Sequence, residues 1–233
     1  KNLQNHDNKN TYKRIRSELE AKGYSVYEDI FNTANFGLPQ KRSRIFIFAT
    51  TEELPYGFMF DFSENRVLEN FQENKSNFGG QSFESVLDIL DVAADKKYFL
   101  SEKVKPTILS DGTAGYKSKS EINQRVARTL TATMHKMHRA CQDNYYSQDY
   151  IESHGKENPA LTCTKEQLAS LPIRKITPEE AFMLQGFPKE FVTDARSAGV
   201  SDGALYQQAG NAVSVNVVYA IMRYLIECNA IKP

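Results

Sequence analysis

The sequence is poor in cysteine, has no tryptophan and contains no long apolar run. Its three cysteines, Cys141, Cys163 and Cys228, form no Cys-x-x-Cys pair. This excludes a dense disulfide framework and gives no basis for a metal site. No stretch approaches 18 uninterrupted apolar residues, so we expect no membrane-spanning helix. A charged-then-apolar leader is also missing. These absences favour a soluble protein of the cytoplasm.

Neither sign of charge is in excess, because 29 lysines and arginines balance 29 aspartates and glutamates. The distribution is nevertheless uneven. Residues 51–100 contain ten acidic and four basic side chains, whereas residues 101–140 contain eight basic and three acidic ones. A basic segment of this kind can form a local nucleic-acid-binding face on a neutral chain. A solvated charged surface would give the same pattern, so charge alone leaves both interpretations open.

Periodic patterns predict regular structure in the first 50 residues. From Thr11, apolar residues recur at helical spacing as far as Gly23, which is a natural helix stop. A strand is expected at residues 24–27, running towards Phe31. A second strand is expected at residues 44–49, which are apolar on both faces and should therefore be buried.

Regular patterns return towards the C-terminus. Residues 177–180, Thr-Pro-Glu-Glu, form a capping box with proline at the first helical position and predict a helix that ends at Gly186. Residues 51–100 are expected to be an irregular crossover with a short helix near 83–90, and residues 126–131 give the best strand of the segment that follows. A last helix should bury one apolar stripe, formed by Val215, Val218, Met222, Leu225 and Ile226.

A pair of arginines stands at the start of the second predicted strand, in Gln40-Lys41-Arg42-Ser43-Arg44. Residues i and i+2 of an extended chain project to the same face, so both guanidinium groups should point one way. Such a pair requires anions or carbonyl oxygens as partners. A structural salt bridge would meet the same requirement, and the motif alone does not separate the two.

A second motif, Gln208-Ala209-Gly210-Asn211-Ala212-Val213, precedes the last predicted helix. Glycine allows a tight turn, and asparagine beside a helix N-terminus can cap the helix or hold a polar ligand. A capped helix without a ligand is the simpler interpretation of this motif taken alone.

Four segments occur in an order that is specific when they are taken together. They are residues 1–11; Asn35–Ile45, with Gln-x-Arg-x-Arg; Arg174–Pro188, with Leu184-Gln185-Gly186-Phe187-Pro188; and Leu205–Leu225, around Gly210-Asn211-Ala212-Val213. This series resembles the DNA cytosine-C5 methyltransferases. The first segment looks like the one that follows the family's Glu-Asn-Val motif. The third looks like the motif that ends the target-recognition region, and the fourth looks like the family's last motif.

The resemblance implies an α/β fold, as a fragment of a Rossmann-like methyltransferase that uses S-adenosylmethionine. Residues 1–50 would be the C-terminal part of the catalytic domain. Residues 51–202 would form a smaller target-recognition domain, mostly β and irregular, which binds double-stranded DNA. Residues 203–233 would return to the catalytic domain. The implied activity is methyl transfer to C5 of a flipped-out cytosine in a specific DNA sequence, within a restriction-modification system.

Site residues follow from matching positions. Arg44 would donate to the cytosine O2, Arg42 would hold the catalytic loop or a phosphate, and Gln40 would support both. Asn211, Ala212 and Val213 would contact the cofactor, and Thr129 would contact the DNA backbone. The basic segment supplies further candidates for DNA contact by their reach: Gln124, Arg125, Arg128, Lys136 and Arg139.

The family's nucleophile is a cysteine that follows a proline, and no cysteine of this chain does so. We expect that cysteine, the glycine-rich cofactor loop and the Glu-Asn-Val glutamate to lie upstream of Lys1, in a missing N-terminal catalytic half. The isolated chain should therefore be inactive. Three explanations stay open: the C-terminal part of a longer enzyme, the small subunit of a two-chain enzyme, and a DNA-binding specificity module without catalysis.

Overall fold

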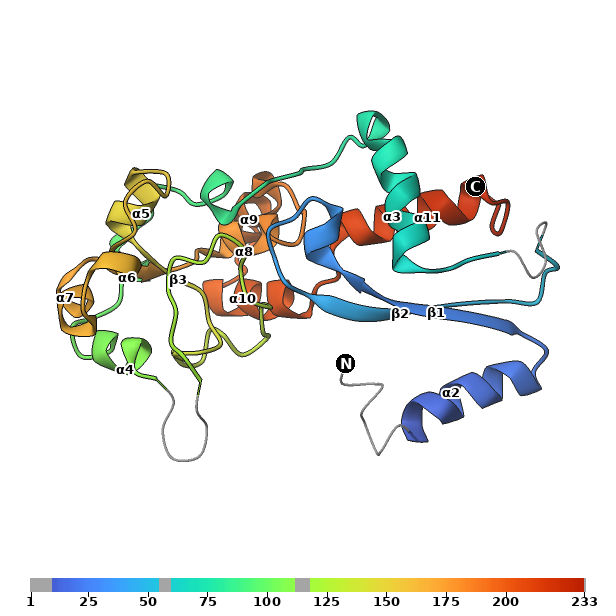
Figure 1. Ribbon diagram of the computed structural model, residues 1–233, viewed down its shortest axis with the longest axis horizontal. Coiled ribbons are helices and arrows are strands. Elements are labelled where there is room, and N and C mark those ends of the chain that lie inside the picture. Colours follow the sequence, from blue (N-terminus) through green and yellow to red (C-terminus); the bar gives the residue numbers. More distant parts are fainter. Residues whose placement is uncertain (1–9, 55–59, 112–117, 233) are drawn as a thin grey trace. The chain divides into compact units, whose positions relative to one another are not determined.

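A computed structural model describes residues 10–54, 60–111 and 118–232. The chain divides into two compact units (Figure 1). We call the first the hairpin unit; it comprises residues 1–36, 42–80 and 216–233. The second, the helical unit, comprises residues 37–41 and 81–215.

The hairpin unit is built on two antiparallel strands, β1 (Ser25–Asn32) and β2 (Ser43–Thr50), paired from Ser25 opposite Thr50 to Asn32 opposite Ser43. Helix α2 (Asn10–Ala21) precedes them and ends at Gly23, whose φ of 83° is the left-handed conformation that glycine adopts without strain. The predicted first helix and both predicted strands are thereby confirmed. Other elements of the unit are the 3₁₀ turns η2 (Thr33–Phe36) and η4 (Lys75–Asn77) and the helices α3 (Glu64–Glu73) and α11 (Val215–Glu227).

Aromatic side chains form the core of the hairpin unit. Phe46 and Phe48 of β2 pack against Phe31 and Phe62, with ring centroids 5.4 Å apart for Phe31 and Phe46 and 6.0 Å apart for Phe48 and Phe62. The prediction that residues 44–49 are buried on both faces is wrong, because all six are half-buried. Only the face that carries the two phenylalanines packs on this core, whereas the alternate residues of β2 do not belong to it.

Helix α11 buries Leu225 of the predicted stripe but exposes three of its other members. Val218, Met222 and Ile226 are 40%, 45% and 36% exposed. The buried residues are Asn216, Val217, Ala220, Ile221, Tyr224 and Leu225. The helix is apolar around most of its circumference, so its periodicity alone does not identify the buried side.

The helical unit consists of short helices and irregular segments around two apolar clusters. Among its described residues, strand is confined to the antiparallel pair β3 (Tyr145–Ser147) and β4 (Ile173–Lys175) and isolated bridges. The predicted domain was mostly β and irregular. The irregular segments are present, but the prediction of mostly β structure is wrong. The helices are α4 (Lys105–Leu109), α5 (Gln148–Glu152), α6 (Pro159–Thr162), α7 (Lys165–Ser170), α8 (Pro178–Met183), α9 (Lys189–Ser197) and α10 (Asp202–Asn211).

Two predicted elements of the helical unit take other forms. Residues 126–131 make a single parallel bridge, between Gln40 and Ala127, instead of a strand. Side-chain oxygens replace the ladder, because Asn144 Oδ1 accepts from the amide of Arg128 at 2.7 Å and Gln40 Oε1 accepts from that of Leu130 at 3.2 Å. The helix expected near residues 83–90 is the 3₁₀ turn η5 (Val86–Asp88); a second such turn is η6 (Lys96–Tyr98).

The predicted capping box of α8 is confirmed. Thr177 Oγ1 accepts from the amide of Glu180, and the Glu180 carboxylate accepts from the amide of Thr177. The same carboxylate accepts two hydrogen bonds from the fully buried guanidinium of Arg174, at 2.8 and 2.9 Å. A buried charge pair joined by two hydrogen bonds therefore fixes the start of α8 against β4.

The compact units differ from the predicted segments in three places. Residues 37–41, predicted within the catalytic segment, belong to the helical unit. Residues 51–80, predicted to begin the target-recognition domain, belong to the hairpin unit, and residues 203–215 belong to the helical unit. The functional assignment of each segment stays a prediction.

The stretch from Asp202 to Glu227 is apolar enough and long enough to cross a membrane by composition alone. It comprises two helices, α10 and α11, with residues 212–214 non-helical between them, and half of its 18-residue apolar window is buried in the protein. The burial is typical of core helices in a soluble protein.

Candidate functional site

Gln40 is a fully buried connector inside the helical unit. Its Nε2 donates to the Leu184 carbonyl at 2.8 Å, and its Oε1 accepts from the amide of Leu130. Thr129 Oγ1 donates to the Lys41 carbonyl at 2.5 Å. Gln40, the first residue of the Gln-x-Arg-x-Arg motif, thus holds the segment that contains Thr129 beside the predicted motif Leu184-Gln185-Gly186.

Gly210 lies where a side chain cannot fit. A Cβ atom at this position would stand 2.3 Å from the amide nitrogen of Ala132 and 2.3 Å from the carbonyl carbon of Thr131. The sequence indicated glycine for a tight turn; the structure adds a close approach between the last turn of α10 and the backbone that follows Thr129 and Leu130.

The predicted cofactor residues follow Gly210 directly. Asn211 is the last residue of α10 and Ala212 is its C-terminal cap, so the motif ends one helix instead of capping the next. Asn211 and Val213 are exposed, whereas Ala212 is half-buried. The segment therefore presents a side-chain amide and an apolar side chain at the surface of the helical unit.

Arg42 and Arg44 belong to the hairpin unit, unlike Gln40. The Arg42 side chain is buried, and its backbone bonds to Asn32 Oδ1 at 3.1 Å and to the amide of Thr33 at 2.9 Å. Burial and the nearby charge of Arg44 lower the pKa of Arg42 to about 10, and burial lowers the pKa of Arg44. Both groups stay protonated at neutral pH. Two neighbouring, desolvated guanidinium groups favour an anion or a carbonyl-bearing ring as ligand.

The predicted DNA-contact residues fall into two groups. Arg125 and Lys136 are exposed. The others make contacts within the chain: Arg128 Nη1 donates to the carbonyls of Glu121 and Asp143, at 2.9 and 3.3 Å, and Gln124 donates to the Glu121 carboxylate at 3.1 Å.

Arg139 also has partners within the chain. Its guanidinium donates to Gln142 Oε1 at 3.1 Å and to the Thr133 hydroxyl. Contact with DNA by Arg128 or Arg139 would use only the remaining donors of each guanidinium group.

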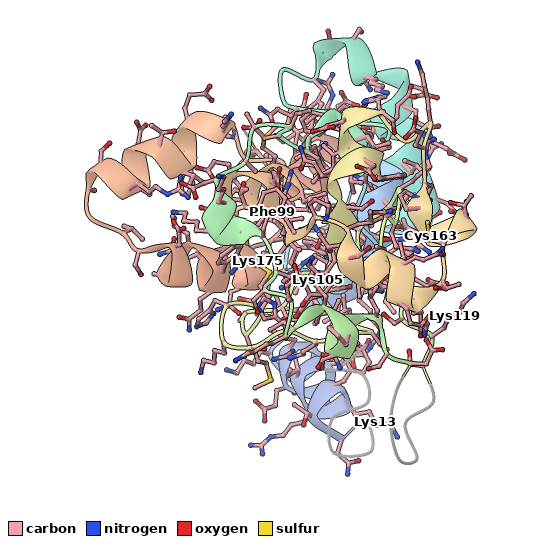
Figure 2. All side chains as sticks on the ribbon, turned by 90° about the vertical axis from the view of Figure 1, so that its left-hand side faces the viewer. Lys13, Phe99, Lys105, Lys119, Cys163 and Lys175 are labelled. Atoms are coloured by element: carbon pink, nitrogen blue, oxygen red, sulfur yellow. The ribbon has the colours of Figure 1, made fainter. Side chains whose placement is uncertain are left out.

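Sequence analysis missed a cluster of titratable groups that includes His138 of this basic segment. Asp143 accepts from the amide of Arg139 at 3.0 Å and from the Tyr145 hydroxyl at 3.3 Å, and that hydroxyl also lies 3.3 Å from His138 Nδ1. The ammonium of Lys175 (labelled in Figure 2) lies 4.8 Å from the centre of the Tyr206 ring. A small cavity of about 20 Å³ is lined by His138, Asp143, Tyr145, Lys175 and Tyr206.

Burial is the largest cause of the pKa shifts in this cluster. Burial raises the pKa values of Asp143 and Tyr145, and it lowers those of His138 and Lys175. No periodic or spacing signal in the sequence brings these residues together, because Lys175 is supplied by β4, far along the chain.

The fold is that of part of a methyltransferase. The structure is similar to that of the Entamoeba histolytica methyltransferase EhMeth, with a TM-score of 0.65 and 19% identity, over 94% of this chain and 58% of that one. It is also similar to the crystal structure of the S. pombe Dnmt2 methyltransferase, with a TM-score of 0.66 and 18% identity, over 99% and 66% of the two chains.

The chain belongs to the C-5 cytosine-specific DNA methylase family, which it matches over residues 1–227. Among its relatives are the type II methyltransferases M1.ScrFI of Lactococcus lactis subsp. cremoris and M.SsoII of Shigella sonnei. Each is 30% identical, over 227 and 226 residues and 97% of this chain, which correspond to 50% and 51% of the relative. The chain thus spans about half the length of these curated relatives.

Proposed function

We propose that the chain is the C-terminal portion of a DNA cytosine-C5 methyltransferase of a restriction-modification system. The complete enzyme transfers a methyl group from S-adenosylmethionine to C5 of a flipped-out cytosine in double-stranded DNA. The observation that carries this proposal is the meeting of Gln40, Leu130, Leu184-Gln185 and Gly210 in one buried network, next to the exposed Thr129. Residues far apart in the sequence thereby place the predicted DNA and cofactor segments together.

The residues near Gly210 fit one end of the cofactor. The methionine end of S-adenosylmethionine carries a carboxylate, which a side-chain amide such as that of Asn211 can bind, and a methylene chain, which suits Val213. Both side chains are exposed. When bound, the cofactor supplies the methyl group. Asn211, Ala212 and Val213 bind and orient its methionine end.

Arg42, which is buried, and Arg44, which is half-buried, act on the flipped cytosine. Arg44 donates to the cytosine O2 and stabilises the negative charge that develops on the ring when a thiolate attacks C6. Arg42 holds the catalytic loop or a phosphate, and its desolvated environment strengthens either contact. Thr129, Arg125 and Lys136 hold the DNA backbone, and Gln124, Arg128 and Arg139 complete the contact surface.

The nucleophilic cysteine belongs to the missing half, because Cys141, Cys163 and Cys228 each follow a residue other than proline. The exposed apolar stripe of α11, formed by Val218, Met222 and Ile226, supports such a partner, since an apolar stripe on a helix requires a covering surface. A one-chain and a two-chain enzyme fit equally well. A DNA-binding module without catalysis is disfavoured, because it has no use for the desolvated pair Arg42 and Arg44.

The test is methylation in cells. The chain and its missing half are expressed together, and bisulfite sequencing maps 5-methylcytosine in the host DNA. We expect methylation at one short sequence. Arg44→Ala should lower turnover by about 10²-fold or more while DNA affinity falls much less. Arg14→Ala, in an exposed ion pair on α2, is the control and should keep full activity. Methylation that survives Arg44→Ala would contradict the role of Arg44, and its absence from the wild type would contradict the proposal.

A further inference from the structure

Gln185 is buried to the same extent as Gln40 and holds both ends of the proposed cofactor segment. Its Nε2 donates to the Ala209 carbonyl at 3.1 Å, and its backbone carbonyl accepts from the amide of Val215 at 2.8 Å. The two partners flank residues 210–214. One residue therefore fixes the length and path of the loop that carries Asn211, Ala212 and Val213.

The neighbour of Gln185 connects this loop to the DNA side of the site. The Leu184 carbonyl accepts from Gln40 Nε2, and Gln40 Oε1 accepts from the amide of Leu130. These contacts form a closed ring, because the backbone of Thr131 and Ala132, next to Leu130, lies against Gly210. We call this closed set, formed by Gln40, Leu130–Ala132, Leu184–Gln185 and Ala209–Gly210, the glutamine network.

The side-chain oxygen of Gln185 argues against a role in fold stability alone. Its Oε1 is buried and has no hydrogen-bond partner among the residues that the structure describes. A buried acceptor without a partner costs stability and offsets part of what the Nε2 hydrogen bond to Ala209 contributes. The amide of Gln185 instead contributes to the geometry of the loop at residues 210–214.

We propose that Gln185 is a positioning residue that couples cofactor binding to DNA binding. The inference rests on the proposed function of the loop and of Thr129. Contact of DNA with the Thr129 segment fixes residues 130–132 against Gly210, and Gln185 passes this constraint to residues 211–213. Each ligand then pays less of the ordering cost once the other is bound, so their affinities rise together.

The test measures this coupling in the enzyme with both halves present. Equilibrium dialysis gives the Kd of tritiated S-adenosylhomocysteine with and without an excess of unmethylated plasmid DNA. We expect DNA to tighten binding by about tenfold in the wild type. In Gln185→Met the ratio should fall to below about twofold. The melting temperature should also fall, because the buried Ala209 carbonyl loses its donor, so the readout is the ratio of the two Kd values. Gln40→Met opens the same network at Leu130 and should lower the ratio as well.

Gln148→Met is the matched control. The Gln148 amide also donates to a backbone carbonyl, that of Val92 at 3.0 Å, but lies outside the network, so the tenfold ratio should persist. A role in stability alone would weaken both Kd values equally and leave the ratio unchanged.

An unchanged ratio in Gln185→Met and in Gln40→Met, or a wild-type ratio of one, would overturn the inference. Failure of the wild type to bind either ligand would instead overturn the proposed function. The two failures are therefore distinguishable.

Discussion

At the scale of single residues, the site depends on contacts that cross long stretches of sequence. Gln40 and Leu184 are 144 residues apart, and Gln185 and Ala209 are 24 apart. The sequence singled out Gln40 and Gly210 through their motifs, but hydrogen bonds at such separations leave no local pattern. Asn144, which holds both the amide and the carbonyl of Arg128, was missed for the same reason.

Gly210 offers a direct test of the close approach. In Gly210→Ala the new Cβ would overlap the backbone of Thr131 and Ala132, so we expect a loss of about 2 kcal/mol or more in the free energy of unfolding, measured in urea. Gly203→Ala, on the same helix, is the control, since the nearest atom there is His135 Cδ2 at 3.7 Å. It should be neutral or slightly stabilising. Equal losses in the two variants would contradict the contact.

Asp143 predicts a pH dependence. Burial raises its pKa above the ordinary value of 3.8, so the folded protein holds this proton more tightly than the unfolded chain does. The contribution of Asp143 to stability therefore falls as pH rises from about 3.8 through the folded pKa. Asp143→Asn cannot ionise and therefore avoids this loss of stability. The stability of the variant relative to the wild type should increase over that pH interval. Urea denaturation at several pH values measures the difference. His138 and Lys175 titrate in both proteins. A difference independent of pH would contradict the raised pKa.

At the scale of elements, patterns were reliable where one physical effect dominates. The capping box of α8 and the Gly23 end of α2 are local, and both are confirmed. Residues 126–131 have the composition of a strand, but side-chain oxygens of Asn144 and Gln40 take the amides that a ladder would use. The periodicity of α11 could not identify its buried face, because apolar residues occupy several faces and tertiary contacts decide among them.

The exposed stripe of α11 allows a test of the proposed association with the missing half. Met222→Asp should weaken association of the chain with that half by about tenfold or more, because it places a charge in an apolar contact. The chain itself should melt as the wild type does, since Met222 is 45% exposed. Association is measured by sedimentation of the mixed halves. The control is Leu161→Asp, at an 83% exposed leucine of the helical unit, and should have no effect. Equal weakening by the two variants would argue against the stripe as the interface.

At the scale of the whole molecule, a balanced net charge and ordinary composition gave no sign of a nucleic-acid partner. The order of four motifs indicated the family, which the match over residues 1–227 establishes. The division into compact units could not be predicted, because residues 37–41 and 81–215 come together only through tertiary contacts such as those of Gln40. The chain spans about half the length of relatives such as M1.ScrFI, and the division of labour between two halves stays a proposal.

The most direct measurement of that division is methyl transfer in vitro. This chain, the half that carries the Pro-Cys motif, and a mixture of the two are each incubated with tritiated S-adenosylmethionine and unmethylated plasmid DNA, and label in the DNA is counted. The account predicts label from the mixture alone. Label from this chain by itself, or none from a mixture whose two halves associate and bind DNA, would contradict it.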